Sequence, residues 1–459
     1  MVQFPEAEPY RIKVVEPIKL TTREQREQIL QNAHYNLFSI PAEDVFIDLL
    51  TDSGTSAMSH YQWAGMMIGD ESYAGCRNWF HLEETVKDIT GYKYVVPTHQ
   101  GRPAENILMT MHVRPGLSAI SNMFFDTTHA HVETKGGVRR ELVINEGLQT
   151  EVEHPFKGNV DIDKLEDTIR RLGRDQIALI MVTITCNNNG GQPVSMANLR
   201  AIRRVADQYG LPFFLDAARY AENAFFIKTR EPGYDNKTIK EIAREMFSYA
   251  DGCTMSAKKD GLVNIGGFLA LNDEKKFRLA QQALILLEGF ITYGGMAGRD
   301  LEALSIGLNE ALDEAYLANR IRQVHYLGNQ LLEAGVPVVR PLGGHSILLD
   351  MKRFLPHIPQ DDFPSEAFVA ALYLDSGTRA IGLGQLPFGG VDKETGKTIY
   401  APLEVVRMAI PRRVYTDNHM NVVAKSVIRV YEGRESLKGM RIDWAPEVLR
   451  HFTAHLQPL

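Results

Sequence analysis

The sequence predicts an α/β protein with a large domain on a mainly parallel sheet and a smaller α+β domain. Between residues 57 and about 310, short apolar runs alternate with helical patterns, as in a parallel sheet covered by helices. After about residue 310, apolar residues first recur at helical spacing, and short strand-like runs follow. A length of 459 residues also favours two domains. We therefore expect a large domain over residues 57–310 and a small domain over residues 1–56 and 311–459.

The apolar runs of the large domain give its expected strands. A run at residues 94–97 precedes a helical pattern, and Ile177–Thr183 has the continuous apolar character of a buried strand. Ser195 is a candidate N-cap for a helix over residues 196–209, which Gly210 would end. Later strands are expected at residues 211–215, 249–255 and 266–271.

The small domain shows a different pattern. A polar helix is expected near residues 22–32, followed by an apolar run at residues 45–50. A second helix, with apolar residues at 321, 324, 327 and 331, would end at Gly335. Short strands are expected at residues 338–339, 346–350 and 406–410.

Composition excludes several classes of protein. The net charge of −7 argues against nucleic acid or an anionic membrane as the main partner. The chain has no run of about 18 apolar residues, and its start lacks the pattern of a secretory signal. Its three cysteines, Cys76, Cys186 and Cys253, are too few and too scattered for a disulfide framework or a zinc site. We therefore expect a cytoplasmic enzyme that acts on a small molecule.

Two charged residues follow strand-like runs and together indicate pyridoxal 5′-phosphate (PLP) chemistry. PLP requires a lysine for its Schiff base and a carboxylate that keeps its ring nitrogen protonated. Asp216 ends one apolar run, although it could equally cap the next helix. Lys258 and Lys259 follow another run, whereas most Lys-Lys pairs lie on solvated surface. We assign Lys259 as the Schiff-base lysine and Lys258 as the neighbour that lowers its proton affinity.

Three further segments can contact the same cofactor. Gln100-Gly101-Arg102 lies between a strand-like run and a helix, where backbone N–H groups suit a phosphate. Arg102 would add a charge-assisted contact. Arg219 could reach the phenolic oxygen of the cofactor. Asn187 is either a donor to that oxygen or a turn residue, and its spacing favours the turn.

Two other charged groups receive a different interpretation. His129, His131 and Glu133 alternate along the chain, which suits a metal site or one face of an exposed strand. No fourth ligand is evident, so a metal is disfavoured. Arg412 and Arg413 are expected at an ion-pair site on the surface or core edge rather than in a nucleic-acid patch.

Taken together, these motifs resemble the β-eliminating lyase family, which includes tryptophanase and tyrosine phenol-lyase. The resemblance extends over nearly the whole chain and is carried by residues 47–55 (IDLLTDSGT), 97–102 (PTHQGR), 190–195 (GGQPVS) and 293–295 (YGG). It implies a PLP-dependent enzyme of fold type I, similar to aspartate aminotransferase in its large domain. It also implies a homotetramer with active sites at subunit interfaces.

The resemblance implies roles for individual residues. PLP would be held by Lys259 and Lys258, at its phosphate by Gln100, Gly101, Arg102 and Ser256, at its ring by Phe125 and Asp216, and at its phenolic oxygen by Asn187 and Arg219. The substrate site would comprise Phe38, Thr51, Ser53, Asn187, Leu383, His451 and Arg407, which would hold the substrate carboxylate. Catalysis would depend on Lys259, Asp126, His451, Arg407 and Tyr73, the last donated by a neighbouring subunit. A potassium ion would bind at Gly54, Glu71 and Asn264.

Three positions bear on the substrate. Leu383 stands where the phenol-lyases carry an arginine that recognises the phenol, and Asp126 and His451 stand where they tend to have threonine and phenylalanine. These differences favour β-elimination of L-tryptophan to indole, pyruvate and ammonia. The alternative is the same chemistry on tyrosine or another β-substituted amino acid.

The chain also departs from the family pattern. Gly382 replaces a glutamate that usually stands there, residues 385–390 differ from the usual run, and Pro103 replaces a glycine. Proline is tolerated in the first turn of a helix, so Pro103 is expected to be harmless. The first two departures affect the region that shapes the side-chain pocket. A PLP-dependent transaminase and an inactive PLP-binding protein are the remaining rivals.

Overall fold

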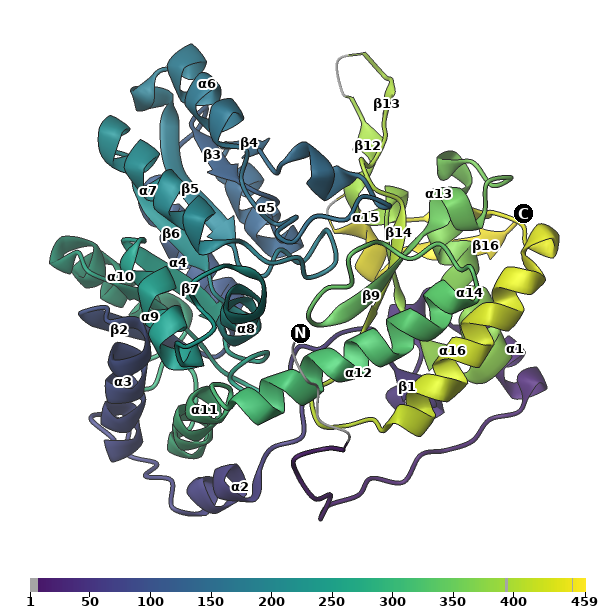
Figure 1. Cartoon of the computed structure of the whole chain (residues 1–459), viewed down its shortest axis with the longest axis horizontal. Coiled ribbons are helices and arrows are strands. Elements are labelled where there is room, and N and C mark those ends of the chain that lie inside the picture. Colours follow the sequence, from purple (N-terminus) through teal and green to yellow (C-terminus); the bar gives the residue numbers. More distant parts are fainter. Residues whose placement is uncertain (1–6, 393–394, 448) are drawn as a thin grey trace. The chain divides into compact units, whose positions relative to one another are not determined.

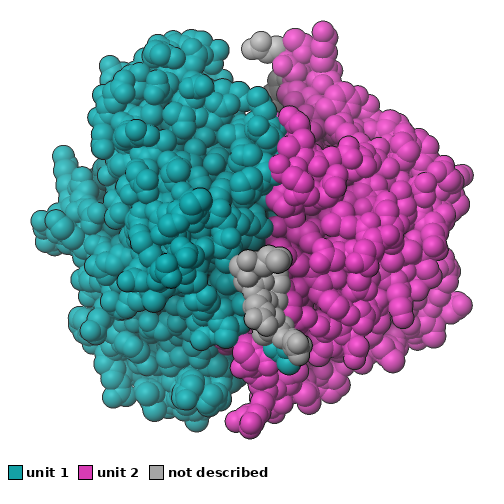
Figure 2. All heavy atoms as spheres, viewed as in Figure 1, with its two compact units in different colours: residues 1–7, 53–147, 154–320 teal, residues 8–52, 148–153, 321–459 magenta. Residues whose placement is uncertain are grey.

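The computed structural model describes residues 7–392, 395–447 and 449–459. The chain divides into two compact units (Figure 2). Unit 1 consists chiefly of residues 53–147 and 154–320, and unit 2 of residues 8–52, 148–153 and 321–459. The divisions at residues 53 and 320 lie near the expected 57 and 310. Residues 148–153, placed in the large domain by sequence, belong to unit 2.

Unit 1 is built on a seven-stranded sheet (Figure 1). In spatial order its strands are β2 (Tyr94–Thr98), β8 (Gly267–Leu271), β7 (Gly252–Ser256), β6 (Phe213–Asp216), β5 (Ile177–Thr183), β3 (Ser118–Ser121) and β4 (Val138–Glu141). β3 to β7 pair in parallel, and β8 is antiparallel to both of its neighbours. The loop from β7 to β8 is too short for a crossover helix, so the chain returns antiparallel. The prediction of a mainly parallel sheet is confirmed.

The helices of unit 1 follow from local signals. They are α2 (His60–Met67), α3 (Arg77–Thr90), α4 (Gly101–His112), α5 (Asp126–Thr134), α6 (Ile162–Leu172), α7 (Met196–Tyr209), α8 (Tyr220–Arg230), α9 (Ile239–Ser248), α10 (Glu274–Leu287) and α11 (Gly298–Glu310). α7 has the expected bounds, because the Ser195 hydroxyl accepts from the Asn198 N–H and Gly210 adopts a left-handed conformation. One apolar cluster packs α4 and α10 against the sheet through Leu108, Leu284 and Leu269.

The expected strand face at residues 129–133 is wrong. These residues lie in α5, where His129 pairs with Glu133 one turn later at 2.9 Å. Two-residue alternation over so short a window also fits a helix, whose i and i+4 positions share a face. Among the described residues, no group of three His, Cys, Asp or Glu side chains could hold a metal ion.

Unit 2 is an α+β assembly. Its three-stranded antiparallel sheet has the order β11 (Ile381–Leu383), β14 (Val405–Ala409), β9 (Ser346–Asp350). Two-stranded pairs are formed by β1 (Ile47–Asp48) with β10 (Thr378–Arg379), β12 (Gly390–Val391) with β13 (Thr398–Ile399), and β15 (Met440–Trp444) with β16 (His455–Pro458). Its helices include α1 (Arg23–Asn32), α13 (Met351–Phe354), α14 (Pro364–Ser376), α15 (Gln385–Phe388) and α16 (Asp417–Glu432).

Three expectations for unit 2 need adjustment. The run at residues 45–50 contributes only the short strand β1, and Val338 forms a single bridge to Leu349 rather than a strand. The helix that carries Ile321 is α12 (Glu314–Glu333), which begins in unit 1 and ends in unit 2. In the part of the chain that the structure describes, we find no helix of the length and apolarity that a membrane crossing requires.

Candidate active site

The candidate site of unit 1 lies at one edge of the sheet. β6 and β7 are parallel neighbours, with Asp216 paired to Thr254, so the carboxyl ends of both strands meet there. Ser256 ends β7, and Lys259 follows three residues later. Ligands of open α/β sheets bind outside the carboxyl ends of parallel strands. The order of elements therefore brings the expected lysine and carboxylate to one place.

Lys259 is held by a hydroxyl group and an aromatic ring. Its amino group donates to the Ser256 Oγ at 2.8 Å and lies 5.6 Å from the centre of the Phe125 ring. The side chain is buried, with 8% of its surface exposed. Phe125 immediately precedes α5, and the backbone there is extended. An amine and an aromatic face thus point into the same small volume.

Asp216 is buried beside this lysine. Burial raises the pKa of the Asp216 carboxyl, and the positive charges of Lys259 and Arg219 oppose that shift. One carboxylate oxygen also accepts from the Ala218 N–H at 3.2 Å, so the residue shapes the local turn as well. Arg219 is buried just before α8. The N–H groups at the start of α8 donate to Asp260, so the interpretation of Asp216 as the cap of that helix is wrong, and its contact with the cofactor stays a prediction.

Glu105 is a site residue that sequence reasoning missed. Its buried carboxylate accepts from the Thr127 hydroxyl at 2.8 Å, next to Asp126 at the start of α5. Burial first, and then the charge of Asp216, raise the pKa of Glu105 to about 7. The available signal was an acidic residue on the apolar face of α4, next to buried Ala104. Asp126 itself accepts from the Thr127 N–H at 2.6 Å.

The start of α4 forms a cradle against the end of β7. Gln100 is the N-cap residue, and Gly101 and Arg102 begin the helix. A β-carbon on Gly101 would lie only 2.6 Å from the Ser256 Cβ, so only glycine permits this approach. The exposed backbone N–H groups of a helix N-terminus suit a phosphate.

Lys258 lies beside two of the three expected cation ligands, Gly54 and Asn264. The Gly54 N–H donates to the Lys258 carbonyl at 2.7 Å, and the Asn264 amide donates to the Gly54 carbonyl at 2.9 Å. Burial, together with the charge of Arg102, lowers the pKa of Lys258. Glu71 instead accepts from the Gly298 N–H at 2.8 Å, at the start of α11. The structure therefore joins Gly54 to Asn264 and holds Glu71 at a helix N-terminus.

Asn187 and Tyr73 occupy contrasting settings. The buried Asn187 donates to the Asn188 side chain at 2.9 Å, inside the turn closed by the Cys186 N–H and the Gln192 carbonyl. Tyr73 is exposed, and its ring centre lies 5.5 Å from that of Phe290. Asn187 lies in a turn, as its spacing predicts, and its contact with the cofactor and the substrate stays a prediction.

Unit 2 carries the expected substrate-carboxylate ligand. Arg407 lies on β14, and its guanidinium donates to the Leu50 carbonyl at 3.1 Å, next to Thr51. An ion pair between Arg412 and Asp52, at 2.9 Å, fixes the same segment. The expected ion pair is confirmed, but its expected place at the surface or core edge is wrong, because both side chains are fully buried. Ser53, the next residue, is assigned to unit 1.

Leu383 and His451 are buried among different neighbours in unit 2. Leu383 belongs to an apolar cluster with Leu348 and Val405. His451 is buried near Phe38, with ring centres 6.1 Å apart, and the Asn36 amide donates to its carbonyl at 3.2 Å.

The groups in unit 1 fit PLP. A buried lysine with a hydroxyl partner, an aromatic face, a buried carboxylate and a glycine-dependent helix N-terminus meet the requirements of its aldehyde, ring, ring nitrogen and phosphate. Residues 48–426 match the family described as "Beta-eliminating lyase". The chain belongs to the β-eliminating lyase family. Members of this family generally use PLP.

Curated relatives of this β-eliminating lyase carry two different activity names. It is 54% identical to a tyrosine phenol-lyase of Symbiobacterium thermophilum, over 100% of both chains. It is 52% identical to a tryptophanase of Salinibacter ruber, over 98% of this chain and 95% of the relative. It is 51% identical to a probable beta-eliminating lyase of Trichomonas vaginalis, over 100% of both. Further relatives named tyrosine phenol-lyase include that of Clostridium tetani, at 51% identity.

A solved structure supports the fold of this lyase. The chain matches one in the crystal structure of the SepCysS–SepCysE N-terminal domain complex with a TM-score of 0.55. The match covers 85% of this chain and 96% of that one at 13% identity, and therefore bears on the fold alone.

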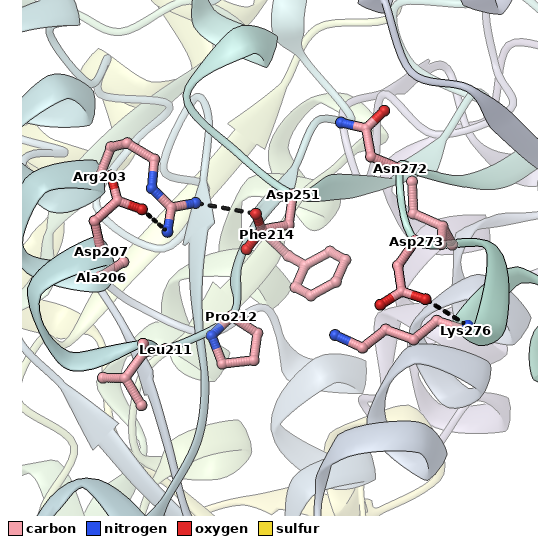
Figure 3. Close-up of a pocket in the computed structure, with 12 residues that line it drawn as sticks. Arg203, Ala206, Asp207, Leu211, Pro212, Phe214, Asp251, Asn272, Asp273 and Lys276 are labelled. Carbon is pink, nitrogen blue, oxygen red and sulfur yellow. Dashed lines mark hydrogen bonds and ion pairs between the residues drawn. The ribbon is translucent and has the colours of Figure 1, made fainter.

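A surface pocket of this lyase lies away from the candidate site (Figure 3). Its cavity of about 470 Å³ is lined by residues such as Pro212 and Asp251, which precede β6 and β7. Asp216 and Ser256 stand at the opposite ends of those strands. Of the charged lining residues, Arg203 pairs with Asp207 at 2.8 Å and with Asp251 at 3.1 Å. The pocket is therefore not where the PLP-binding groups gather.

Proposed function

We propose that this protein is a PLP-dependent lyase of fold type I that converts L-tryptophan and water to indole, pyruvate and ammonia. The observation that carries the choice of substrate is the setting of Leu383. It packs with Val339, Leu348 and Val405, and these apolar side chains offer no charge to a phenol. An indole ring requires apolar contact, whereas a phenol hydroxyl is recognised by a hydrogen-bonding group.

The residues of the chain have distinct tasks in this proposal. PLP, when bound, supplies the electron sink that makes loss of the substrate α-proton possible. The Lys259 amine takes that proton, and its contact with Ser256 orients it. Asp216 holds a proton on the ring nitrogen, and Arg407 pairs with the substrate carboxylate through its guanidinium fork. Tyr73 and Asp126 assist protonation of the indole ring carbon that leaves.

We also propose a homotetramer that binds potassium near Gly54, Glu71 and Asn264. The surface of unit 1 supports association, because the α2 residues Tyr61, Trp63 and Met67 are 64%, 49% and 87% exposed. Tyr73 is exposed as well, as a residue donated to a neighbouring subunit would be before assembly.

Tyrosine is the second candidate substrate. Several relatives at 50% identity or above are named tyrosine phenol-lyase, which favours phenol as a leaving group. Sequence identity does not separate the two, because the relative named tryptophanase is 52% identical.

Product analysis tests both candidates. The protein, loaded with PLP and potassium, is incubated separately with L-tryptophan, L-tyrosine and S-methyl-L-cysteine. We expect indole with equal pyruvate from tryptophan and little phenol from tyrosine, with Lys259→Ala as the inactive control. Formation of phenol as the main aromatic product would identify tyrosine, rather than tryptophan, as the preferred substrate. An indole-bearing keto acid without free indole would indicate a transaminase instead.

A further inference from the structure

Two glycines at the end of β11 each face a buried carboxylate. A β-carbon on Gly382 would collide with the Oε1 atom of Glu366 and lie 2.9 Å from the Ser365 Cβ. A β-carbon on Gly384 would collide with the carboxylate of Glu404. Carbon atoms pack at about 3.5–4.0 Å, so no larger residue fits at either position without displacing a carboxylate. Glu366 and Glu404 thus fill the volume that side chains at 382 and 384 would take.

The two carboxylates lie on the opposite face of the sheet from the substrate-site residues. In the register of β11 and β14, Ile381 pairs with Arg407 and Leu383 pairs with Val405. Side chains alternate along a strand, so Arg407 and Leu383 share one face and Gly382 faces the other. That other face is covered by α14, which carries Glu366.

Glu404 is fixed by several donors. It accepts from the Gln385 N–H at 2.7 Å, from the Gln360 amide at 3.2 Å and from the Ser365 hydroxyl. The Gln385 contact anchors the first residue of α15, directly after Gly384. The conformation of the chain that follows Leu383 is therefore set by the carboxylate of Glu404, the residue directly before β14.

Glu366 supplies a second, neutral carboxyl group. Burial first, and then the charge of Glu404, raise the pKa of Glu366 to about 8. Burial also raises the pKa of Glu404, while its hydrogen bonds with Ser365 and Gln360 lower it. Near neutral pH the pair thus carries about one negative charge, which avoids two buried like charges.

The chain that follows Leu383 is also hydrogen-bonded to the segment that holds His451. The Arg450 guanidinium donates to the Leu386 carbonyl at 2.5 Å and to the Gln385 carbonyl at 2.6 Å. A shift of α15 would therefore act on both Leu383, before it, and His451, next to Arg450.

We propose that Glu366 is a positioning residue for substrate selection, whose carboxyl group takes the space of the side chain missing at Gly382. Together with Glu404 it sets the position of Leu383 and α15, and through them the choice of leaving group. The inference rests on the proposed β-elimination. It also accounts for Gly382, where the family pattern has a glutamate: the carboxylate comes from α14 instead of from the strand.

Moving the carboxylate from position 366 to position 382 tests this proposal. Gly382→Glu alone would force two side chains into one space, and Glu366→Ala alone would leave a hole beneath β11. For each we expect the ratio of kcat/KM for tryptophan to that for S-methylcysteine to change about tenfold or more, since small displacements of a site are costly. The double variant Glu366→Ala, Gly382→Glu returns a carboxylate to the space, and we expect the ratio to recover to within about threefold.

Gly433→Ala is the matched control. It lies in unit 2 directly after α16, and a β-carbon there would meet only the Arg429 carbonyl, at an ordinary contact distance of 3.5 Å. We expect it to leave both the ratio and the Tm unchanged. PLP binding, measured by the absorbance of the bound cofactor, should be normal in every variant, because the substitutions lie in unit 2 and Lys259 lies in unit 1.

The outcomes separate the inference from the proposed function. Absence of indole from the wild-type protein would count against the proposed substrate, and the ratio of kcat/KM for tyrosine to that for S-methylcysteine would then replace the tryptophan ratio in the same test. Recovery of both the ratio and the Tm in the double variant would support the proposal. A lower Tm with an unchanged ratio in Glu366→Ala would reduce Glu366 to a packing role and overturn it. Failure of the double variant to recover the ratio would do the same.

Discussion

The groups around Lys259 and the groups around Leu383 are built in different ways. The first lie at or within a few residues of the carboxyl ends of β2, β3, β6 and β7 in one seven-stranded sheet. The second depend on contacts from α14, from Glu404 and from Arg450 near the chain end. One region is fixed by the order of elements along the chain. The other is fixed by side chains that are distant in sequence.

Under the proposed function, this difference would separate the chemistry from the choice of substrate. Substitutions in unit 2 can move Leu383 without changing the strand ends that position Lys259 and Asp216. Related enzymes can therefore keep one reaction and change its leaving group, which agrees with relatives of nearly equal identity that carry different activity names. The tests below either sharpen this separation or remove it.

The largest effect is expected from Lys259→Ala. Loss of the amine that takes the α-proton should lower pyruvate formation at least about 10³-fold for every substrate. Lys276→Ala, in the pocket at the opposite strand ends, is the control and should retain activity. Activity of Lys259→Ala within tenfold of wild type would place the chemistry elsewhere. Pyruvate formation can be measured by coupling it to a second enzyme that reduces pyruvate.

Arg407→Lys should act on all amino-acid substrates equally. It keeps the charge but loses the guanidinium fork, and with it the contact to the Leu50 carbonyl. We expect KM to rise about 10- to 100-fold for both tryptophan and S-methylcysteine, with a smaller change in kcat. Arg429→Lys, in an exposed ion pair with Asp375, serves as control. A rise confined to tryptophan would show that Arg407 contacts the side chain rather than the carboxylate.

Leu383→Arg should change selection without removing the chemistry. A guanidinium at this position can bind a phenol hydroxyl, so the kcat/KM ratio of tyrosine to tryptophan should rise about tenfold. Leu383→Met keeps the apolar cluster with Val405 and should leave the ratio nearly constant. An unchanged ratio in the arginine variant would mean that residue 383 does not face the leaving group.

The smallest effect is expected in the way the stability of the folded protein depends on pH. Burial raises the pKa of Glu366 from its ordinary value of 4.5 to about 8. Between these values the folded protein holds a proton that the unfolded chain has released, so stability falls as pH rises and levels off above about 8. Glu366→Gln cannot titrate, and its Tm should therefore fall less than that of wild type between pH 6 and pH 9. Glu432→Gln, on the exposed side of α16, should behave like wild type.

Where local signals decide, the sequence was sufficient. Ser195 and Gly210 mark the two ends of α7, and the unbroken apolar run of β5 marks a strand buried on both faces. Asp216 and Lys259 could be assigned because each follows such a run. The alternation at His129 was misread, since five residues cannot separate a helix from a strand.

What could not be predicted depends on contacts between distant segments. Glu105 acquires its raised pKa only because the fold buries it near Asp216. Glu366 meets Gly382 only because α14 packs on β11, and no spacing in the sequence announces that contact. The sequence showed that position 382 lacks the glutamate of the family pattern. It did not show that Glu366 places a carboxyl group there instead.

The collision between Glu366 and any side chain at position 382 also restricts the order in which mutations can occur. A residue larger than glycine at 382 requires that the Glu366 carboxylate move or that residue 366 be shortened. One route that avoids the collision passes through a sequence with glycine at 382 and a short residue at 366. That intermediate contains a cavity and is less stable. We therefore expect substitutions at positions 382 and 366 to be linked.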